Sequence, residues 1–136
     1  MRENSITYEQ MLAKINPKVG GSYVFASLAE LPPDVEPMAL IREQEGVTVA
    51  LSLEDAQKVG LDLQELYTII TLSAPGSLDV VGLNSGISQV LSTRSIPSNI
   101  FSGIYHTHIF VPSDRVEEAK ALLDDISGQA RAWMNH

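Results

Sequence analysis

A Pro-Gly corner followed by a serine is the best candidate binding feature in this sequence. Pro75 and Gly76 follow the apolar run of residues 67–73 and precede a helical pattern that begins near Ser77. The first N–H groups of a helix have no partner within the helix, and the helix dipole places partial positive charge there. A small anion such as a carboxylate is therefore favoured at this corner. A tight turn without a ligand explains the same residues, so both interpretations stay open.

A second pattern that could do chemistry is His106-Thr107-His108. Side chains two residues apart on an extended strand point to the same side, so the two imidazoles could bind one metal ion. A protein metal site needs at least a third ligand. No Asp or Glu is placed by its spacing to supply that ligand, and the other histidine is the C-terminal His136. A hairpin turn with partly exposed imidazoles is the favoured interpretation.

Sequence patterns typical of enzymes are missing. Residues 82–86, Gly-Leu-Asn-Ser-Gly, carry the serine one place too late for a nucleophile elbow. The chain has no Walker A loop and no Gly-x-Gly-x-x-Gly fingerprint. It contains no cysteine, which excludes disulfides and thiolate chemistry. We therefore predict a protein that has no catalytic activity of its own and uses no cofactor.

Composition limits the class of partner. The chain has 136 residues, of which 44% are hydrophobic, and a net charge of −8. Its nine Lys and Arg residues form no basic cluster, so nucleic acids and anionic membranes are disfavoured as partners. No apolar run reaches the length of a signal peptide or a membrane span. We expect a cytoplasmic protein.

The elements that must position the corner follow from apolar periodicity and turn residues. The second half of the chain has the order β-α-β-β-α. The expected elements there are strands at 67–73, 99–105 and 108–111, a turn at 106–107, and helices from Ser77 to about Arg94 and from Pro112 to Gly128. The helix from Ser77 contains Gly82 and Gly86, each of which lowers helix propensity by about 1 kcal/mol relative to alanine. Close packing on this face explains them, either across a dimer or on the chain's own sheet.

The first half has a looser version of this order, namely a strand, a loop, two strands and a short helix. The expected elements are a short helix at 7–15, a strand at 22–28, hairpin strands at 38–43 and 47–51, and a helix between Ser52 and Gly60. The two halves could be loose echoes of one unit. Their sequences differ too much to establish a repeat from the residues alone.

Two motifs resemble the ACT domain of amino-acid-sensing regulators. They are Ala74-Pro75-Gly76-Ser77-Leu78 at the corner and Asn99-Ile100-Phe101-Ser102-Gly103 in the next strand. The match sharpens to a bacterial group of small ACT-like proteins, and it extends over residues 8–127. The further segments that carry it are 23–25, 42–48, 81–83 and 105–112.

The resemblance implies an α+β, ferredoxin-like fold of two tandem ACT-like units, similar to the regulatory region of aspartate kinases. Each unit would have an antiparallel sheet with helices packed on one face. The implied division is a degenerate unit at residues 1–62, a regular unit at 63–128 and a tail at 129–136. ACT domains usually associate side by side, so the resemblance also implies a homodimer or a higher homo-oligomer.

By family likeness, a free amino acid would bind at the corner and at the start of the following strand. The implied ligand contacts are Ser73, Ala74, Pro75, Gly76, Ser77, Leu78, Ser98, Asn99 and Ile100. The favoured function is thus an amino-acid-binding regulatory module. The alternatives are a protein-interaction or dimerisation module without a small ligand, and a metal-binding protein that uses His106 and His108.

Overall fold

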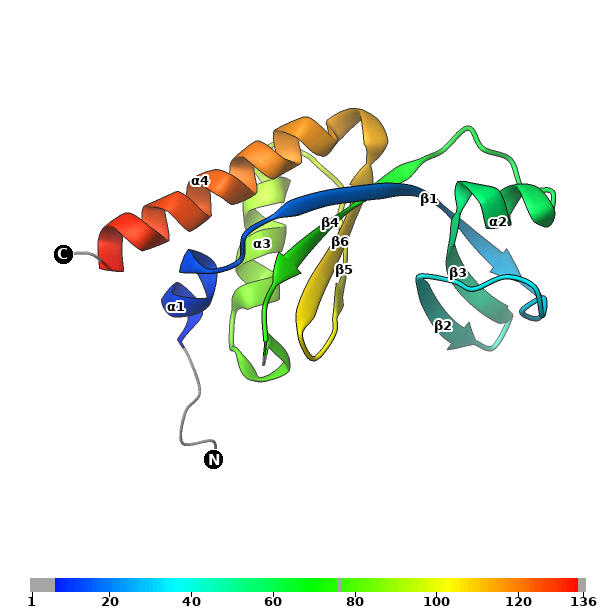
Figure 1. Cartoon of the computed structure of the whole chain (residues 1–136), viewed down its shortest axis with the longest axis horizontal. Coiled ribbons are helices and arrows are strands. Elements are labelled where there is room, and N and C mark those ends of the chain that lie inside the picture. The colour runs from blue at the N-terminus through cyan, green and yellow to red at the C-terminus, as the bar shows by residue number, and fades with distance from the viewer. Residues whose placement is uncertain (1–6, 76, 135–136) are drawn as a thin grey trace.

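A single antiparallel sheet of six strands forms the frame of the molecule, in the order β2-β3-β1-β4-β6-β5 (Figure 1). The computed structural model describes residues 7–75 and 77–134. Its strands are β1 (Lys18–Leu28), β2 (Ala39–Glu43), β3 (Gly46–Ser52), β4 (Tyr67–Ser73), β5 (Asn99–Ser102) and β6 (His106–Pro112). Its helices are α1 (Tyr8–Ala13), α2 (Leu53–Lys58), α3 (Leu83–Ser92) and α4 (Val116–Met134), with short 3-10 turns η1 (Ser77–Asp79) and η2 (Ser113–Arg115).

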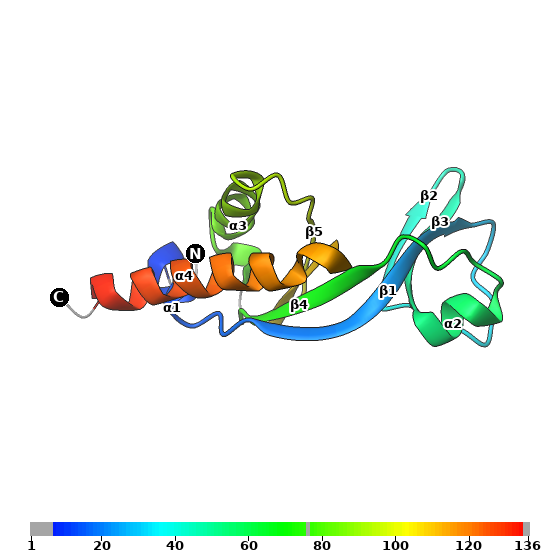
Figure 2. The same ribbon diagram turned by 90° about the horizontal axis from the view of Figure 1, so that it is seen from above.

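The long strand β1 joins the two ends of this sheet. Its first part, from Lys18 to Tyr23, pairs with β4, and its second part, from Tyr23 to Leu28, pairs with β3. Helices α1, α3 and α4 lie at one end of the molecule and α2 at the other, with β1 running between them (Figure 2). The α+β class is confirmed, but the separate sheets expected for two units are one continuous sheet.

Each end of the sheet has an apolar core beneath its helices. The larger core lies under α1, α3 and α4, where Ile70 and Leu72 of β4 alternate with residues that face the other way. The smaller core lies under α2 and contains Val24, Val49 and Leu51. Burial of these aliphatic side chains contributes roughly 1.5–3 kcal/mol each, so the alternation along the strands fixes which face the helices cover.

An aromatic cluster lies on the opposite face of the strands. Phe110 of β6 is fully buried at its centre. Its ring meets those of Tyr23, Phe25 and Phe101 edge-on, with ring centroids 5.4, 5.1 and 5.7 Å apart. Edge-to-face pairs of this kind add about 0.5–1.5 kcal/mol each beyond burial. Since Tyr23 and Phe25 are on β1, these contacts tie the joining strand to β6.

The helix predicted to start at Ser77 begins later than expected. Residues 77–79 form the turn η1, and α3 begins only at Leu83, after Gly82. Gly82 has a φ of 93°, a left-handed conformation that glycine adopts readily and that a helix interior excludes. Gly82 therefore ends the loop instead of interrupting a helix, and the prediction of one helix from 77 to 94 was wrong.

The other helical glycine, Gly86, does mark a close contact. A Cβ atom at this position would overlap the hydroxyl of Tyr8 in α1. The close packing inferred from the sequence is therefore an approach of α1 to α3 within the chain.

Two further boundaries differ from the sequence predictions. The turn between β5 and β6 lies at residues 103–105, where the N–H of Gly103 donates to the carbonyl of His106 at 2.8 Å. His106 and Thr107 are thus strand residues and not the turn. The last helix does not end at Gly128 but continues to Met134. The additional turns of α4 beyond Gly128 are stabilised by Arg131, which donates to Ser127 Oγ at 2.8 Å and to the carbonyl of Ala13 at 3.4 Å.

Helix α1 packs away from the first half of the sequence. Met11, Leu12 and Ile15 are buried in the larger core with α3 and α4. The division of the chain between residues 62 and 63 stays a prediction. The residues of α1 pack with α3 and α4, which belong to the second part of the chain.

Gly46, at the start of β3, is the glycine whose replacement we expect to cost most. Its φ is 147°, and a Cβ atom would overlap the carbonyl oxygen of Leu28. We predict that Gly46→Ala lowers the free energy of unfolding by about 2–4 kcal/mol, from backbone strain and overlap together. Urea denaturation followed by circular dichroism measures this. Gly21→Ala is the matched control, because a Cβ there meets nothing within 4 Å; equal losses in both variants would contradict the prediction.

Candidate functional site

The Pro-Gly corner leaves β4 at Ser73, and the chain itself uses the N–H groups there. The N–H of Ser73 donates to the carbonyl of Ile15 at 2.7 Å, and that of Ala74 donates to the carbonyl of Tyr105 at 3.0 Å. Ala74 is fully buried, whereas Ser73 and Pro75 are exposed. Gly76 lies outside the described residues. The corner is therefore a tight junction of three segments, and neither the Ser73 nor the Ala74 N–H is available to a ligand.

The start of α3 lies six residues beyond the position predicted from sequence, and its N-cap, Gly82, offers no side-chain hydrogen bond. Asn84 in the first turn of α3 is exposed, and its Nδ2 donates to Ser102 Oγ at 2.9 Å. The start of α3 is thereby tied to the end of β5, and the binding of an anion at a helix start stays a prediction.

The second part of the predicted contact set lies at the other end of the strands. Asn99 pairs with Phe110, which pairs with Ile69, whereas Ser73 is four residues further along β4. Four strand residues span about 13 Å. Asn99 is exposed, while Ile100 packs against the larger core. Within one chain, Ser98, Asn99 and Ile100 are therefore not brought together with Ser73, Ala74 and Pro75.

The loops around the corner expose large apolar side chains. Leu78 and Val81, in the connection from β4 to α3, are 62% and 90% exposed. Ile104 and Tyr105, in the turn from β5 to β6, are 63% and 70% exposed. The hydrogen bond from Ala74 to Tyr105 holds the two loops together. We call these four residues the apolar tip; grouped exposure of this kind is typical of interaction surfaces.

The two histidines of β6 lie side by side, next to the aromatic cluster. The centroids of the His106 and His108 rings are 6.1 Å apart. His108 Nδ1 is 3.0 Å from Thr71 Oγ1. Burial, and then the nearby charge of His106, lower the pKa of His108 below its ordinary value. Among residues 7–75 and 77–134, no third potential ligand joins them in a group able to hold a metal ion.

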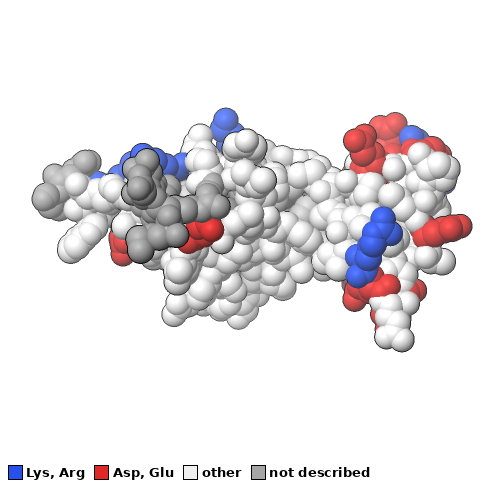
Figure 3. Space-filling view, turned by 90° about the horizontal axis from the view of Figure 1, so that it is seen from below, with Lys and Arg blue, Asp and Glu red and all other residues white. Residues whose placement is uncertain are grey.

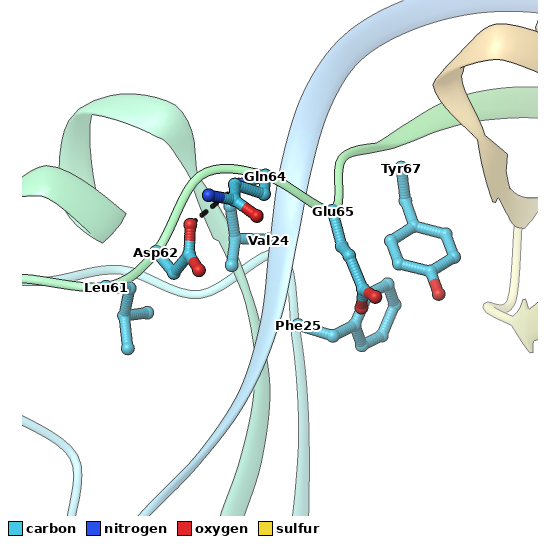
Figure 4. Close-up of a pocket in the computed structure, with 7 residues that line it drawn as sticks. All are labelled: Val24, Phe25, Leu61, Asp62, Gln64, Glu65 and Tyr67. Atoms are coloured by element: carbon cyan, nitrogen blue, oxygen red, sulfur yellow. Dashed lines mark hydrogen bonds between the residues drawn. The ribbon is translucent and has the colours of Figure 1, made fainter.

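A cavity that sequence reasoning missed lies where the connection from α2 meets β1 and β4 (Figure 4). Its volume is about 330 Å³. It is lined by Val24, Phe25, Leu61, Asp62, Gln64, Glu65 and Tyr67. These residues come from segments about 40 positions apart, so only the pairing of β1 with β4 brings them together.

The lowered pKa of His108 predicts a pH dependence of stability. Below about pH 6.5, the unfolded chain binds a proton at this histidine more readily than the folded chain does. The free energy of unfolding therefore decreases as the pH falls through this value. We expect thermal melting to show a larger loss between about pH 8 and 5.5 in the wild type than in His108→Gln. The loss in His106→Gln should lie between those of the wild type and His108→Gln, because this change removes only the charge of His106, the smaller cause of the lowered pKa. Equal losses in all three proteins would refute the assignment of the pH dependence to His108.

Comparisons with known proteins agree with this fold. A family model described as an ACT domain matches residues 7–68. A solved structure from Vibrio cholerae, described as a protein of unknown function and a possible transport protein, is 33% identical. The alignment covers 88% of this chain and 94% of that one, with a TM-score of 0.75. A protein from Agrobacterium tumefaciens shares the fold at 18% identity and a TM-score of 0.66, covering 84% of this chain and 90% of that one. No curated protein matches the sequence.

The family match falls on the first half of the chain, whereas the corner and Asn-Ile motifs that resemble an ACT domain lie in the second half. No helix in the described part of the chain is both long and apolar enough to cross a membrane.

ACT domains are regulatory modules that bind small molecules. The family match, together with 33% identity over nearly the full length of the Vibrio protein, shows that this chain belongs to the ACT-domain family.

Proposed function

We propose that this chain is a regulatory module that binds a free amino acid between two copies of itself and has no catalytic activity of its own. The observation that carries the proposal is the apolar tip, which surrounds the corner and leaves Leu78, Val81, Ile104 and Tyr105 open to solvent. A monomer gains nothing from exposing four large apolar side chains together, whereas an interface buries them.

The internal symmetry of the sheet supports an arrangement of two ACT-like units. Tyr23 of β1 pairs with Ser52 of the neighbouring strand β3 and with Tyr67 of its other neighbour, β4. Tyr67 in turn pairs with Pro112 of β6. The order β2-β3-β1 is thus repeated, reversed, as β4-β6-β5. In this proposal each unit has three strands of its own, and the other unit supplies the fourth. The loop of residues 29–38 then replaces, in the first unit, the helix α3 of the second.

The separation of Asn99 from the corner supports a site shared between copies. One chain would contribute the start of α3, where N–H groups favour a carboxylate. The other would contribute Asn99, whose exposed side-chain oxygen accepts a hydrogen bond from an amino group. An α-amino acid has both a carboxylate and an amino group, whereas a simple carboxylate anion has no amino group. The pair of contacts therefore favours a zwitterion.

A second candidate function is a dimerisation module without a small ligand. The apolar tip favours it as well, since burial of this surface needs no ligand. The two functions differ in one respect: a ligand site requires the polar contribution of Asn99, and a plain interface does not.

A thermal-shift screen against the common amino acids tests ligand binding. A ligand at one hundred times its dissociation constant stabilises the folded state by about 2.7 kcal/mol, which corresponds to a shift of roughly 8 °C for a chain of this size. We expect Asn99→Ala to abolish the shift. Gln89→Ala, an exposed change on α3, is the matched control and should retain it. A screen without any shift would leave the dimerisation module as the better explanation.

Dimerisation through the apolar tip is tested by Val81→Asp. Val81 is 90% exposed, so the change leaves the fold intact but places a charge in the interface. We expect sedimentation equilibrium to give the mass of a dimer for the wild type and the monomer mass of 14.8 kDa for the variant. Ile41→Asp, on the edge strand β2 at the other end, is the control and should stay dimeric. A wild-type monomer would refute the shared site.

A further inference from the structure

The cavity between β1, β4 and the connection from α2 is separate from the apolar tip. It lies beside Tyr67, the first residue of β4, whereas the corner follows Ser73, the last. Six strand residues span about 20 Å. The cavity is therefore a second concave region whose lining has its own chemistry.

One wall of the cavity is aromatic. The rings of Phe25 and Tyr67 meet edge-on, with centroids 5.2 Å apart, and both are partly exposed. Val24 and Leu61 add apolar surface. The faces of aromatic rings attract cations, and the attraction grows when the cation loses water.

The charged groups that line the cavity are both carboxylates. In Figure 4, Glu65 extends toward the ring of Phe25, with Tyr67 on one side and Asp62 on the other. One oxygen of Asp62 accepts the N–H of Gln64 at 3.0 Å. Within the described residues, neither Asp62 nor Glu65 forms an ion pair. Both side chains are exposed, and no cationic side chain of the described residues competes for them.

The end of the molecule beside the cavity is strongly acidic. Residues 29–66 hold nine Asp and Glu against two Lys and Arg, which gives −7 of the total charge of −8. Figure 3 shows the acidic side chains gathered at the end that carries α2, β2 and β3, beside a middle region almost free of charge. Lys58, one of the two cations, is paired with Asp55 at 3.5 Å. A concentrated negative potential of this kind raises the local concentration of cations.

We propose that this cavity binds a small organic cation, an ammonium or guanidinium group on a short aliphatic body. The head group would pair with Glu65 and Asp62, and the body would lie against Phe25 and Tyr67. A volume of about 330 Å³ suits a ligand of this size. A neighbouring cavity of about 480 Å³, which shares Glu65 and Tyr67 and adds Asp114, extends the same negative lining toward η2.

The site joins the two ends of the sheet. Phe25 lies on the part of β1 that pairs with β3, Tyr67 begins β4, and Asp62 and Glu65 follow α2. A ligand held by all four would contact both ends of the sheet at once.

The probe is n-butylguanidinium, and its neutral control is the near-isostere n-butylurea. The full chain, labelled with ¹⁵N, is titrated while its amide spectrum is recorded. We expect saturable shifts at residues 24–25 and 61–67 with the cation only, with a dissociation constant in the millimolar range for a probe of about eight non-hydrogen atoms. Glu65→Gln should weaken binding roughly fivefold or more, by loss of the charge pair.

Glu54→Gln is the matched charge control, because Glu54 is exposed in the same acidic region but does not line the cavity. It should keep the wild-type affinity. Equal weakening by both variants, equal binding of n-butylurea, or no saturable shift would overturn the proposal. Binding of tetralysine without binding of n-butylguanidinium would also overturn it, in favour of an acidic surface for a basic protein. The amino acid screen at the corner is independent of all these outcomes.

Discussion

The fold depends on β1 pairing with two different strands along its length. Tyr23 is the point of exchange, since it lies opposite Ser52 of β3 and Tyr67 of β4. Before it, β1 belongs to the end with α3 and α4, and after it to the end with α2. Without this strand the two ends would be small sheets with unpaired edges, and such edges are prone to pair with other chains.

The aromatic cluster strengthens this joint from the face without helices. Phe110 is fully buried because rings from β1 and β5 close around it. Tyr67 joins the same cluster through Phe25, and these two rings also form the aromatic wall of the cavity. The packing that holds β1 in place therefore also shapes a candidate binding site. A change in that packing would disturb the contacts of β1 with both ends of the sheet.

The apolar tip and the cavity divide the surface into regions of different character. The tip exposes apolar side chains in two loops tied by the bond from Ala74 to Tyr105, while the cavity carries unpaired carboxylates beside an acidic end. The two regions lie at opposite ends of β4, so the chain presents two separate candidate interaction surfaces.

Local patterns in the sequence predicted the order of the six strands and the α+β class, although the bounds of β1, β5 and β6 differ from the predicted ones. Alternation in residues 67–73 predicted β4 within its observed bounds, because one face of that strand is buried and the other is not. The start of α3, the length of α4 and the site depended on tertiary contacts: Gly82 ends a loop, Arg131 reaches Ala13, and Asn99 lies away from the corner. Periodicity reports which face of a segment is buried but not what lies against it. The family motif could therefore be recognised from residues alone, while the pairing of β1 with β4 decided which residues line the cavity.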